Sequence, residues 1–283
     1  MTFTGALLTL VAAQASVRLQ PGVARPGDAV LVEVTGTQKA PSGRLGPAEL
    51  VFLPWGTSWL ALTGLAVEQK PGTLALEVTA GPELLQGALE VKKPDFRRRQ
   101  LSVSKRFTSI SKKDRLRSKA DQDAFQDAFD RDFEPWLFER AFAWPRQAEV
   151  TAPFGDLRLL NGKKKSQHFG ADLDGNTGDP IFAANDGEVV LVRDCFASGN
   201  TVLLHHGGRL FTSYFHLSST EVKQGERVVR GQPLGTVGKT GRVTGPHLHF
   251  GAKLDGRWVD PESVLRLELS DRPTSAAASP GTP

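Results

Sequence analysis

The stretch VKQGERVVRGQPLGTVGKTGRVTGPHLHF, residues 222–250, gives the main indication of the fold. Its glycines recur at intervals of three to six residues between short runs of Val and Leu, a pattern typical of short strands joined by tight turns. At its end, His247 and His249 alternate with apolar neighbours. Alternate side chains of an extended strand lie on one face, about 7 Å apart, so these two imidazoles can address one metal ion.

The same patterning extends over most of the 283 residues. Between Val17 and Val103, apolar segments recur between Pro-Gly and Gly-Pro turns, which predicts a β-sandwich of immunoglobulin-like type. From about Glu149 to Leu267, strands and glycine turns alternate again. The 29 glycines and 18 prolines support a mainly β protein, and the length suffices for two domains that each bury a core.

A different period separates the two β regions. Phe125, Phe129 and Phe133 recur every four residues among charged side chains, which predicts an amphipathic helix from Lys112 to about Glu134. We interpret these phenylalanines as a stripe that packs against a neighbouring domain, because a ligand site is the less common reason for such spacing.

A basic segment overlaps this helix. Between Lys92 and Lys119 twelve basic residues face two acidic ones, and either contact with an anionic envelope polymer or a solvated face beside a linker explains the surplus. The net charge is only +4, so the pI of about 9.3 does not indicate a specific nucleic-acid partner.

Cysteine usage restricts the metal chemistry. The single cysteine, Cys195, excludes an intrachain disulfide and any cysteine cluster, so a metal ligand set must consist of His and carboxylates. Near the N-terminus, the apolar residues 6–13 followed by Ala13-Gln14-Ala15 resemble a signal peptide that lacks the usual positive residues in front. No other stretch is long and apolar enough for a transmembrane segment.

All six histidines lie in the second β region. In the motif His168-Phe169-Gly170-Ala171-Asp172, His168 and Asp172 share a face if the segment is extended, and Gly170 allows other groups to approach closely. A catalytic zinc usually takes three protein ligands and leaves the fourth position to water. His168, Asp172 and one residue of the later pair fit this number, and spacing alone does not separate the roles of His247 and His249.

The order of these motifs closely resembles the lysostaphin-type zinc endopeptidases of bacterial cell walls. The resemblance covers about residues 153–264, and its motifs are HFGAD (168–172), YFHLS (214–218), the stretch 222–250, ANDGEVV (184–190), GNTVLLHHG (199–207) and DPESVL (260–265). It implies a zinc metalloendopeptidase that hydrolyses peptide cross-links of peptidoglycan. By position it implies one Zn²⁺ per chain bound by His168, Asp172 and His249, with His216 and His247 as catalytic histidines.

The mechanism that the resemblance implies is ordinary zinc chemistry. The ion polarises the scissile carbonyl and lowers the pKa of a water towards about 7. His216 and His247 would move the protons, and which of them is the general base stays open. His205 and His206, in front of a Gly-Gly turn, are interpreted as structural or surface residues.

Two departures from the family pattern concern the surroundings of the site. Gly251 stands where many members have Glu after the H-x-H-Phe run, so an orienting contact is either absent or supplied elsewhere. No tyrosine precedes His168 in residues 162–167, and the only tyrosine is Tyr214.

The expected organisation has five parts. A signal peptide (1–15), an immunoglobulin-like β-sandwich (16–104), a charged helical linker (105–145), a glycine-rich antiparallel β-sheet metallopeptidase domain (146–267) and a disordered tail (268–283) follow one another. The protein is expected to be secreted or periplasmic, at the cell envelope.

Two other functions were weighed against catalysis. One is a non-enzymatic regulator that binds and activates a cell-wall amidase, and the other is a zinc-stabilised wall-binding module without turnover. Family members of the regulator kind characteristically lose zinc ligands, so the five retained residues favour an enzyme. The peptide bond that is cut, autoinhibition by the first domain or linker, and the oligomeric state stay open.

Overall fold

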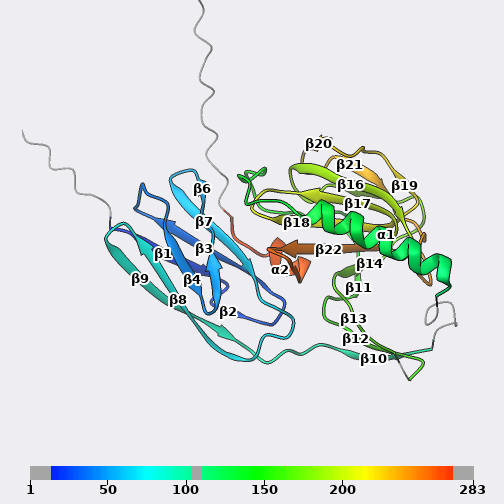
Figure 1. The fold of residues 1–283 in the computed structure, drawn as a ribbon, viewed down its shortest axis with the longest axis horizontal. Helices are drawn as coiled ribbons and strands as arrows, with labels where there is room; N and C mark the ends of the chain where they lie inside the picture. The colour runs from blue at the N-terminus through cyan, green and yellow to red at the C-terminus, as the bar shows by residue number, and fades with distance from the viewer. Residues whose placement is uncertain (1–13, 103–109, 163, 270–283) are drawn as a thin grey trace, which may run out of the picture.

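The computed structural model describes residues 14–102, 110–162 and 164–269, and it is mainly β, as predicted. Two β regions lie side by side, with helix α1 (Lys112–Phe129) along the outer side of the second (Figure 1). Residues 1–13 of the expected signal peptide and residues 270–283 of the expected tail lie outside the described residues.

Two sheets form the first region. The strand order of one sheet is β1 (Ser16–Gln20), β3 (Ala29–Thr35), β7 (Ser58–Gly64) and β6 (Leu53–Trp55). The order of the other is β2 (Val23–Ala24), β9 (Glu83–Val91), β8 (Gly72–Ala80), β4 (Ser42–Leu45) and β5 (Ala48–Leu50). Both sheets contribute apolar side chains to one core, among them Val30, Val32, Leu76, Val78 and Leu89. The immunoglobulin-like type of this arrangement stays a prediction.

The first sheet is buried on both faces. Side chains of a strand alternate between faces; Val30 and Val32 of β3 enter the core of the first region, whereas Leu31 enters a second core. That second core also contains Phe138 and residues of the second region such as Leu254 and Val259. The two regions therefore share buried apolar surface instead of being joined by a linker alone.

An antiparallel sheet dominates the second region. Its strand order is β11 (Val150–Ala152), β14 (Ala171–Leu173), β22 (Leu248–Leu254), β18 (Leu210–Leu217), β17 (Gly199–His205), β16 (Gly187–Cys195) and β20 (Arg227–Val228), with β23 (Arg257–Val259) beside β22. A smaller sheet contains β15 (Pro180–Phe182), β21 (Pro233–Thr236) and β19 (Ser219–Thr220), and the short helix α2 (Pro261–Leu265) follows β23. The predicted glycine-rich antiparallel sheet is confirmed.

A strand from the basic segment joins the second region. β10 (Arg98–Leu101) pairs in parallel with β12 (Leu157–Leu160), which pairs with β13 (Lys164–Gln167). Just before these strands, Arg97 donates two hydrogen bonds, of 3.0 and 3.1 Å, to the fully buried carboxylate of Asp156. Part of the positive charge between residues 92 and 119 is thus paired with a buried carboxylate at the protein surface.

Helix α1 packs as predicted but ends earlier. Phe125 and Phe129 contact the rings of Phe215 and Phe211 on β18, with centroids 5.8 and 5.1 Å apart. The expected end near Glu134 was wrong, because the helix is capped at Asp130, whose φ of −79° and ψ of 78° are not helical. Aspartate is a weak helix former, and its charge is unfavourable at the negative end of the helix dipole.

Membrane-spanning helices are absent from the described part of the chain, where no helix combines the necessary length with sufficient apolar character.

The shared core generates a prediction about Gly64. A Cβ atom added there would lie 2.5 Å from Cγ1 of the buried Val259, across the junction of the two regions. We expect Gly64→Ala to lower stability by about 1–3 kcal/mol through overpacking, measured as a lower urea midpoint. Gly87→Ala is the control, because its added Cβ would meet only ordinary contacts, the nearest at 3.4 Å. Equal midpoints for the two variants would show that the junction is not tightly packed.

Candidate metal centre

Three side chains from two separate motifs meet between β14 and β22. Asp172 of β14 is the register partner of His249 on β22, and His168 lies just after β13. Nε2 of His168 and Nδ1 of His249 each lie 2.9 Å from Oδ1 of Asp172, and the two nitrogens are 3.0 Å apart. These three residues form a group whose ligand atoms can surround one ion.

The hydrogen-bonding partners of His168 indicate that this group fits a metal ion. Its Nδ1 lies 2.9 Å from the carbonyl oxygen of Pro153, which can only accept, so Nδ1 carries the hydrogen. Nε2 can then donate to the carboxylate oxygen of Asp172 only if the ring is charged; in a neutral ring its lone pair would face that oxygen, and a cation between the two would be needed. Ligands of a tetrahedral zinc at 2.0–2.1 Å would lie about 3.3 Å apart, within a few tenths of an ångström of the separations here.

Two neighbours determine where the ring of His249 lies. A Cβ atom on Gly170 would lie 2.6 Å from Cε1 and Nε2 of this ring, so the expected close approach at Gly170 is confirmed. On another side Phe215 stacks on His249, with centroids 5.1 Å apart and an interplanar angle of 8°. Since Phe215 also contacts Phe125 of α1, the helix supports the metal centre through one intervening ring.

His216 and His247 lie beside this group. Their ring centroids are 5.0 Å apart, and Nε2 of His247 lies 3.7 Å from Oδ1 of Asp172. Nδ1 of His216 and Nδ1 of His247 each lie 3.0 Å from a backbone carbonyl, of Thr240 and Gly245 respectively. Because a carbonyl only accepts, Nδ1 donates in both residues, and Nε2 of each ring is the nitrogen left to exchange a proton.

The backbone of His216 is unusual. Its φ is 67°, in the left-handed region that residues other than glycine seldom adopt. Its N–H donates to the carbonyl of Ser198 over 2.8 Å, which helps to hold this conformation. Strained backbone of this kind occurs preferentially at functional sites.

The electrostatics of the cluster suit metal binding. Burial, together with the nearby imidazoles of His249 and His247, lowers the pKa of His216 to about 3, and burial also lowers the pKa of His249. Burial opposes ionisation of Asp172, but hydrogen bonds with His168 and His249 outweigh it and hold its pKa well below the usual range. At neutral pH, His216 and His249 are therefore neutral and the carboxyl group is ionised, as a metal site requires.

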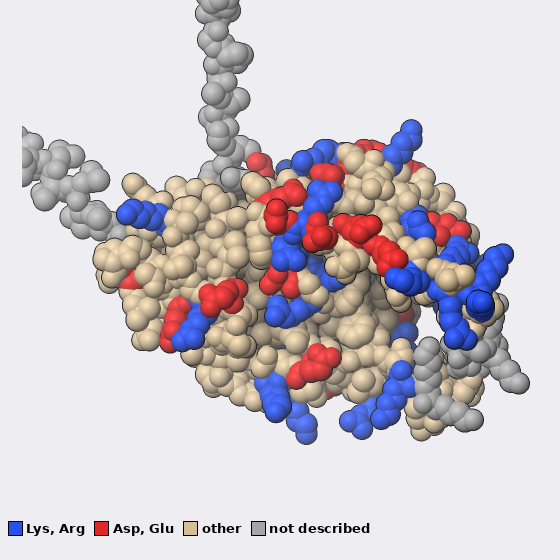
Figure 2. Space-filling model, in the orientation of Figure 1, with Lys and Arg blue, Asp and Glu red and all other residues tan. Residues whose placement is uncertain are grey.

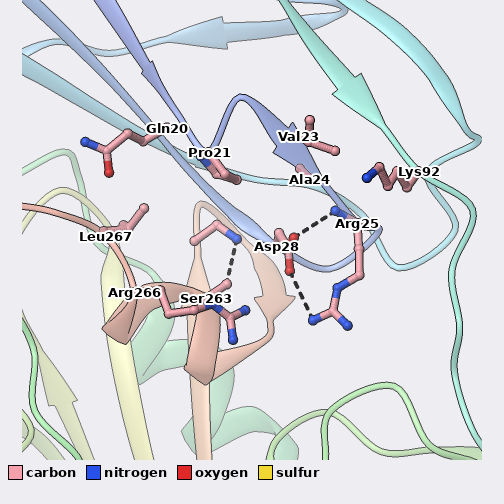
Figure 3. A pocket seen from close by; sticks show the side chains of 11 residues that line it. Gln20, Pro21, Val23, Ala24, Arg25, Asp28, Lys92, Ser263, Arg266 and Leu267 are labelled. Atoms are coloured by element: carbon pink, nitrogen blue, oxygen red, sulfur yellow. Dashed lines mark hydrogen bonds and ion pairs between the residues drawn. The ribbon is translucent and has the colours of Figure 1, made fainter.

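The structure has two cavities of similar volume, one at the candidate site and one at the junction between the two regions. All five residues line a groove of about 540 Å³, which also contains Arg158 and Arg242. The other cavity, of about 560 Å³, lies at the junction and has no histidine in its lining (Figure 3). In Figure 3, Arg25 faces Asp28, and the backbone N–H of Ala29 donates to Ser263. The five candidate site residues therefore lie in the groove and not in the junction cavity.

Tyr214, His205, His206 and Gly251, which the sequence also singled out, do not line the groove. Tyr214 is fully buried, and its hydroxyl accepts a hydrogen bond from the backbone of Ala184. His205 and His206 are also fully buried, which decides for the structural interpretation over the surface one. Gly251 faces Ser213 and Trp258. The sequence reasoning missed Arg158, although it lies in a stretch near the start of the family resemblance.

Two histidines and one aspartate around a common point, with two further imidazoles in the same groove, define a metal-dependent hydrolase site. Residues 166–261 match the model of peptidase family M23. The chain belongs to peptidase family M23, whose members are zinc-dependent.

Named relatives match between about a third and two fifths of the chain. Peptidoglycan DD-endopeptidase ShyA of Vibrio cholerae is 44% identical over 98 residues, which are 35% of this chain and 23% of that protein. ShyC, also a peptidoglycan DD-endopeptidase of Vibrio cholerae, is 42% identical over 117 residues, 41% of this chain and 27% of that protein. The matches thus span about a quarter of these curated relatives.

Solved structures extend the similarity. A crystal structure described as a peptidase M23 from Pseudomonas aeruginosa has a TM-score of 0.65 and 28% identity, and covers 85% of this chain and 94% of that one. The catalytic domain of lysostaphin from Staphylococcus simulans is 31% identical, covers 42% of this chain and 93% of that one, and has a TM-score of 0.39. The Pseudomonas structure therefore shares both regions of the fold.

The ligand geometry generates a prediction for His168. We expect His168→Ala to lose most of its zinc, because a site with three protein ligands becomes one with two. Zinc per chain after dialysis against a weak chelator measures this. Ser166→Ala, which changes a polar side chain of the same groove that is no ligand, should keep the wild-type zinc content. Wild-type zinc content in His168→Ala would reject His168 as a ligand.

A second prediction concerns Gly170. The added methyl group of Gly170→Ala would displace the ring of His249, and we expect zinc affinity to fall by about 10–100-fold, as when an orienting partner of a ligand is lost. Competition with a fluorescent chelator measures the affinity. Gly245→Ala is the matched control, because an added Cβ atom there meets nothing within 4 Å. An unchanged affinity in Gly170→Ala would contradict the close approach.

Proposed function

We propose that this protein is a zinc metalloendopeptidase that hydrolyses peptide cross-links of bacterial peptidoglycan. In this proposal His168, Asp172 and His249 bind one zinc ion per chain, and His216 and His247 are catalytic. The single observation that supports it most is the convergence of these five side chains, from three separate motifs, in one groove of about 540 Å³.

The residues of the groove have separate roles in the proposed reaction. When bound, zinc polarises a carbonyl oxygen and makes water more acidic. Nε2 of neutral His216 is held towards the groove by the hydrogen bond from Nδ1 to Thr240, so it can accept a proton at neutral pH. His247 is oriented by the same kind of bond to Gly245, and its Nε2 lies 3.7 Å from Oδ1 of Asp172. When Nε2 of His247 carries a proton, it can give that proton to the leaving amine or hold the oxyanion with it, and the proton that His216 takes from the water keeps the proton balance.

The substrate class is supported by the relatives. ShyA and ShyC are named peptidoglycan DD-endopeptidases, and they are 44% and 42% identical to this chain over 98 and 117 residues. Since the chain covers only about a quarter of those proteins, their activity is a proposal for this one. A cell-wall substrate requires a location outside the cytoplasm, which agrees with the expected secretion.

The basic segment is the proposed contact for an anionic envelope polymer. Figure 2 shows Lys and Arg side chains gathered around one end of α1. Since Arg97 already donates a hydrogen bond to Asp156, the exposed Lys and Arg side chains of α1 are the better candidates for contact with such a polymer. We also propose that residues 16–104 and 146–267 act as the two domains, with the first supporting the second through the shared core.

Digestion of purified peptidoglycan tests the activity. We expect the zinc-loaded protein to release new peptide amines, identified by mass analysis of the products, and a chelator to abolish this release until zinc is restored. His247→Ala should keep its zinc and lose about 10²–10⁴-fold in rate, the usual contribution of a general acid or base. The masses also identify the bond that is cut.

Two outcomes would replace the proposal. Wild-type protein that holds a full equivalent of zinc, releases no amines and stimulates a wall amidase would be the regulator. Zinc binding and wall binding without either effect would indicate a binding module.

A further inference from the structure

The two oxygens of the Asp172 carboxylate face different partners. Oδ1 lies 2.9 Å from the ligand nitrogens of His168 and of His249. Oδ2 accepts a hydrogen bond from Nη2 of Arg158 over 3.3 Å, and these atoms also form an ion pair. One oxygen therefore belongs to the metal group and the other to a fixed cation.

Arg158 is held in place by its strand. It is the register partner of Arg99 on β10 and of Ser166 on β13, so β12 is paired on both sides at this residue. Its side chain is 23% exposed, and its Nε is buried without a hydrogen-bond partner among the described residues. Taking a guanidinium out of water is costly unless a carboxylate compensates, and the ion pair identified for Arg158 is with Asp172.

The positive charge of Arg158 does not by itself favour metal binding. A guanidinium beside a metal centre repels the incoming cation, so its contribution has to come from what it does to the carboxylate. An aspartate that is free to rotate can offer both oxygens to one ion. The second oxygen would then take the coordination position that a catalytic zinc keeps open.

We propose that Arg158 is a positioning residue that holds Oδ2 of Asp172 away from the metal, so that the carboxylate binds through Oδ1 alone and one coordination position stays open. This inference rests on the proposed zinc site. It also supplies a candidate for the orienting contact that is missing at Gly251, whose surroundings are Ser213, Trp258 and Phe169.

An arginine in a peptidase groove has an obvious alternative role, which is to bind a carboxylate of the substrate. The two roles differ in what they change. A substrate-binding arginine alters KM for carboxylate-bearing peptides and leaves the empty metal centre as it is. A residue that orients a ligand alters the coordination of the metal without any substrate present.

Cobalt substitution separates these roles. The visible bands of Co²⁺ weaken as its coordination number rises from four to five, because geometry governs their intensity. We expect Co²⁺-loaded Arg158→Ala to keep one metal per chain and to show weaker bands than wild type. With zinc, its kcat for a cross-linked peptide should fall by about 10–100-fold with little change in KM.

Arg158→Lys and Lys165→Ala are the controls. The ammonium group of Arg158→Lys can still donate one hydrogen bond to Oδ2, so this variant should recover most of the wild-type spectrum. Lys165→Ala removes an exposed positive charge from the neighbouring strand β13, and its spectrum should equal that of wild type. Circular dichroism of all variants checks that they are folded.

Several results would overturn the role of Arg158. These are an unchanged cobalt spectrum in folded Arg158→Ala, loss of the metal from that variant, or a change in KM alone. Wild-type protein that binds neither Zn²⁺ nor Co²⁺ would instead refute the metal site itself, so the two failures are distinguishable.

Discussion

One half-buried carboxylate, that of Asp172, organises the proposed active site. A carboxylate out of water has to be compensated by hydrogen bonds or opposite charge, and the chain brings partners to it from four places. His168 arrives from the turn after β13, His249 from β22, His247 from the loop before that strand, and Arg158 from β12. Without those partners, burial would favour the protonated form, which does not bind metal.

The same arrangement explains why the fold surrounds the site with rigid, paired strands. β14 and β22 are register partners at Asp172 and His249, so the sheet itself sets the distance between two of the ligands. β12 lies between β10 and β13, which fixes Arg158 from both sides. Metal-binding side chains have to keep their positions to within tenths of an ångström. Paired strands provide this support, whereas a mobile loop would not.

The sequence predicted what is local and missed what depends on distant partners. Alternation in His247-Leu248-His249 was enough to place two imidazoles on one side of a strand, and both lie near Oδ1 of Asp172. Gly170 predicted that another group approaches the backbone closely at this position, and the ring of His249 is that group. Yet only the family resemblance distinguished ligand from catalytic histidine, because the two positions have equivalent spacing.

The features that the sequence did not reveal all depend on contacts between segments that are far apart in the chain. The parallel pairing of β10 with β12 joins residues about sixty positions apart, and no local pattern encodes that register. The apolar run of β3 predicted a strand of the first region, but it did not reveal that the second region packs against the other face of this strand. Arg158 lay in a short strand with leucines on both sides, where an arginine would ordinarily face solvent.

The junction between the two regions connects fold to chemistry. Leu31 enters the core that also holds Leu254, the last residue of β22, while His249 lies near the first. α1 contacts the site from another direction, since Phe125 touches Phe215 and Phe215 stacks on His249. The strand that carries the proposed ligand His249 is therefore packed at one end against the first region and near the other end against Phe215, which the helix contacts. A β-sandwich without a histidine can in this way contribute to catalysis, because it limits the movement of the strand on which a ligand depends.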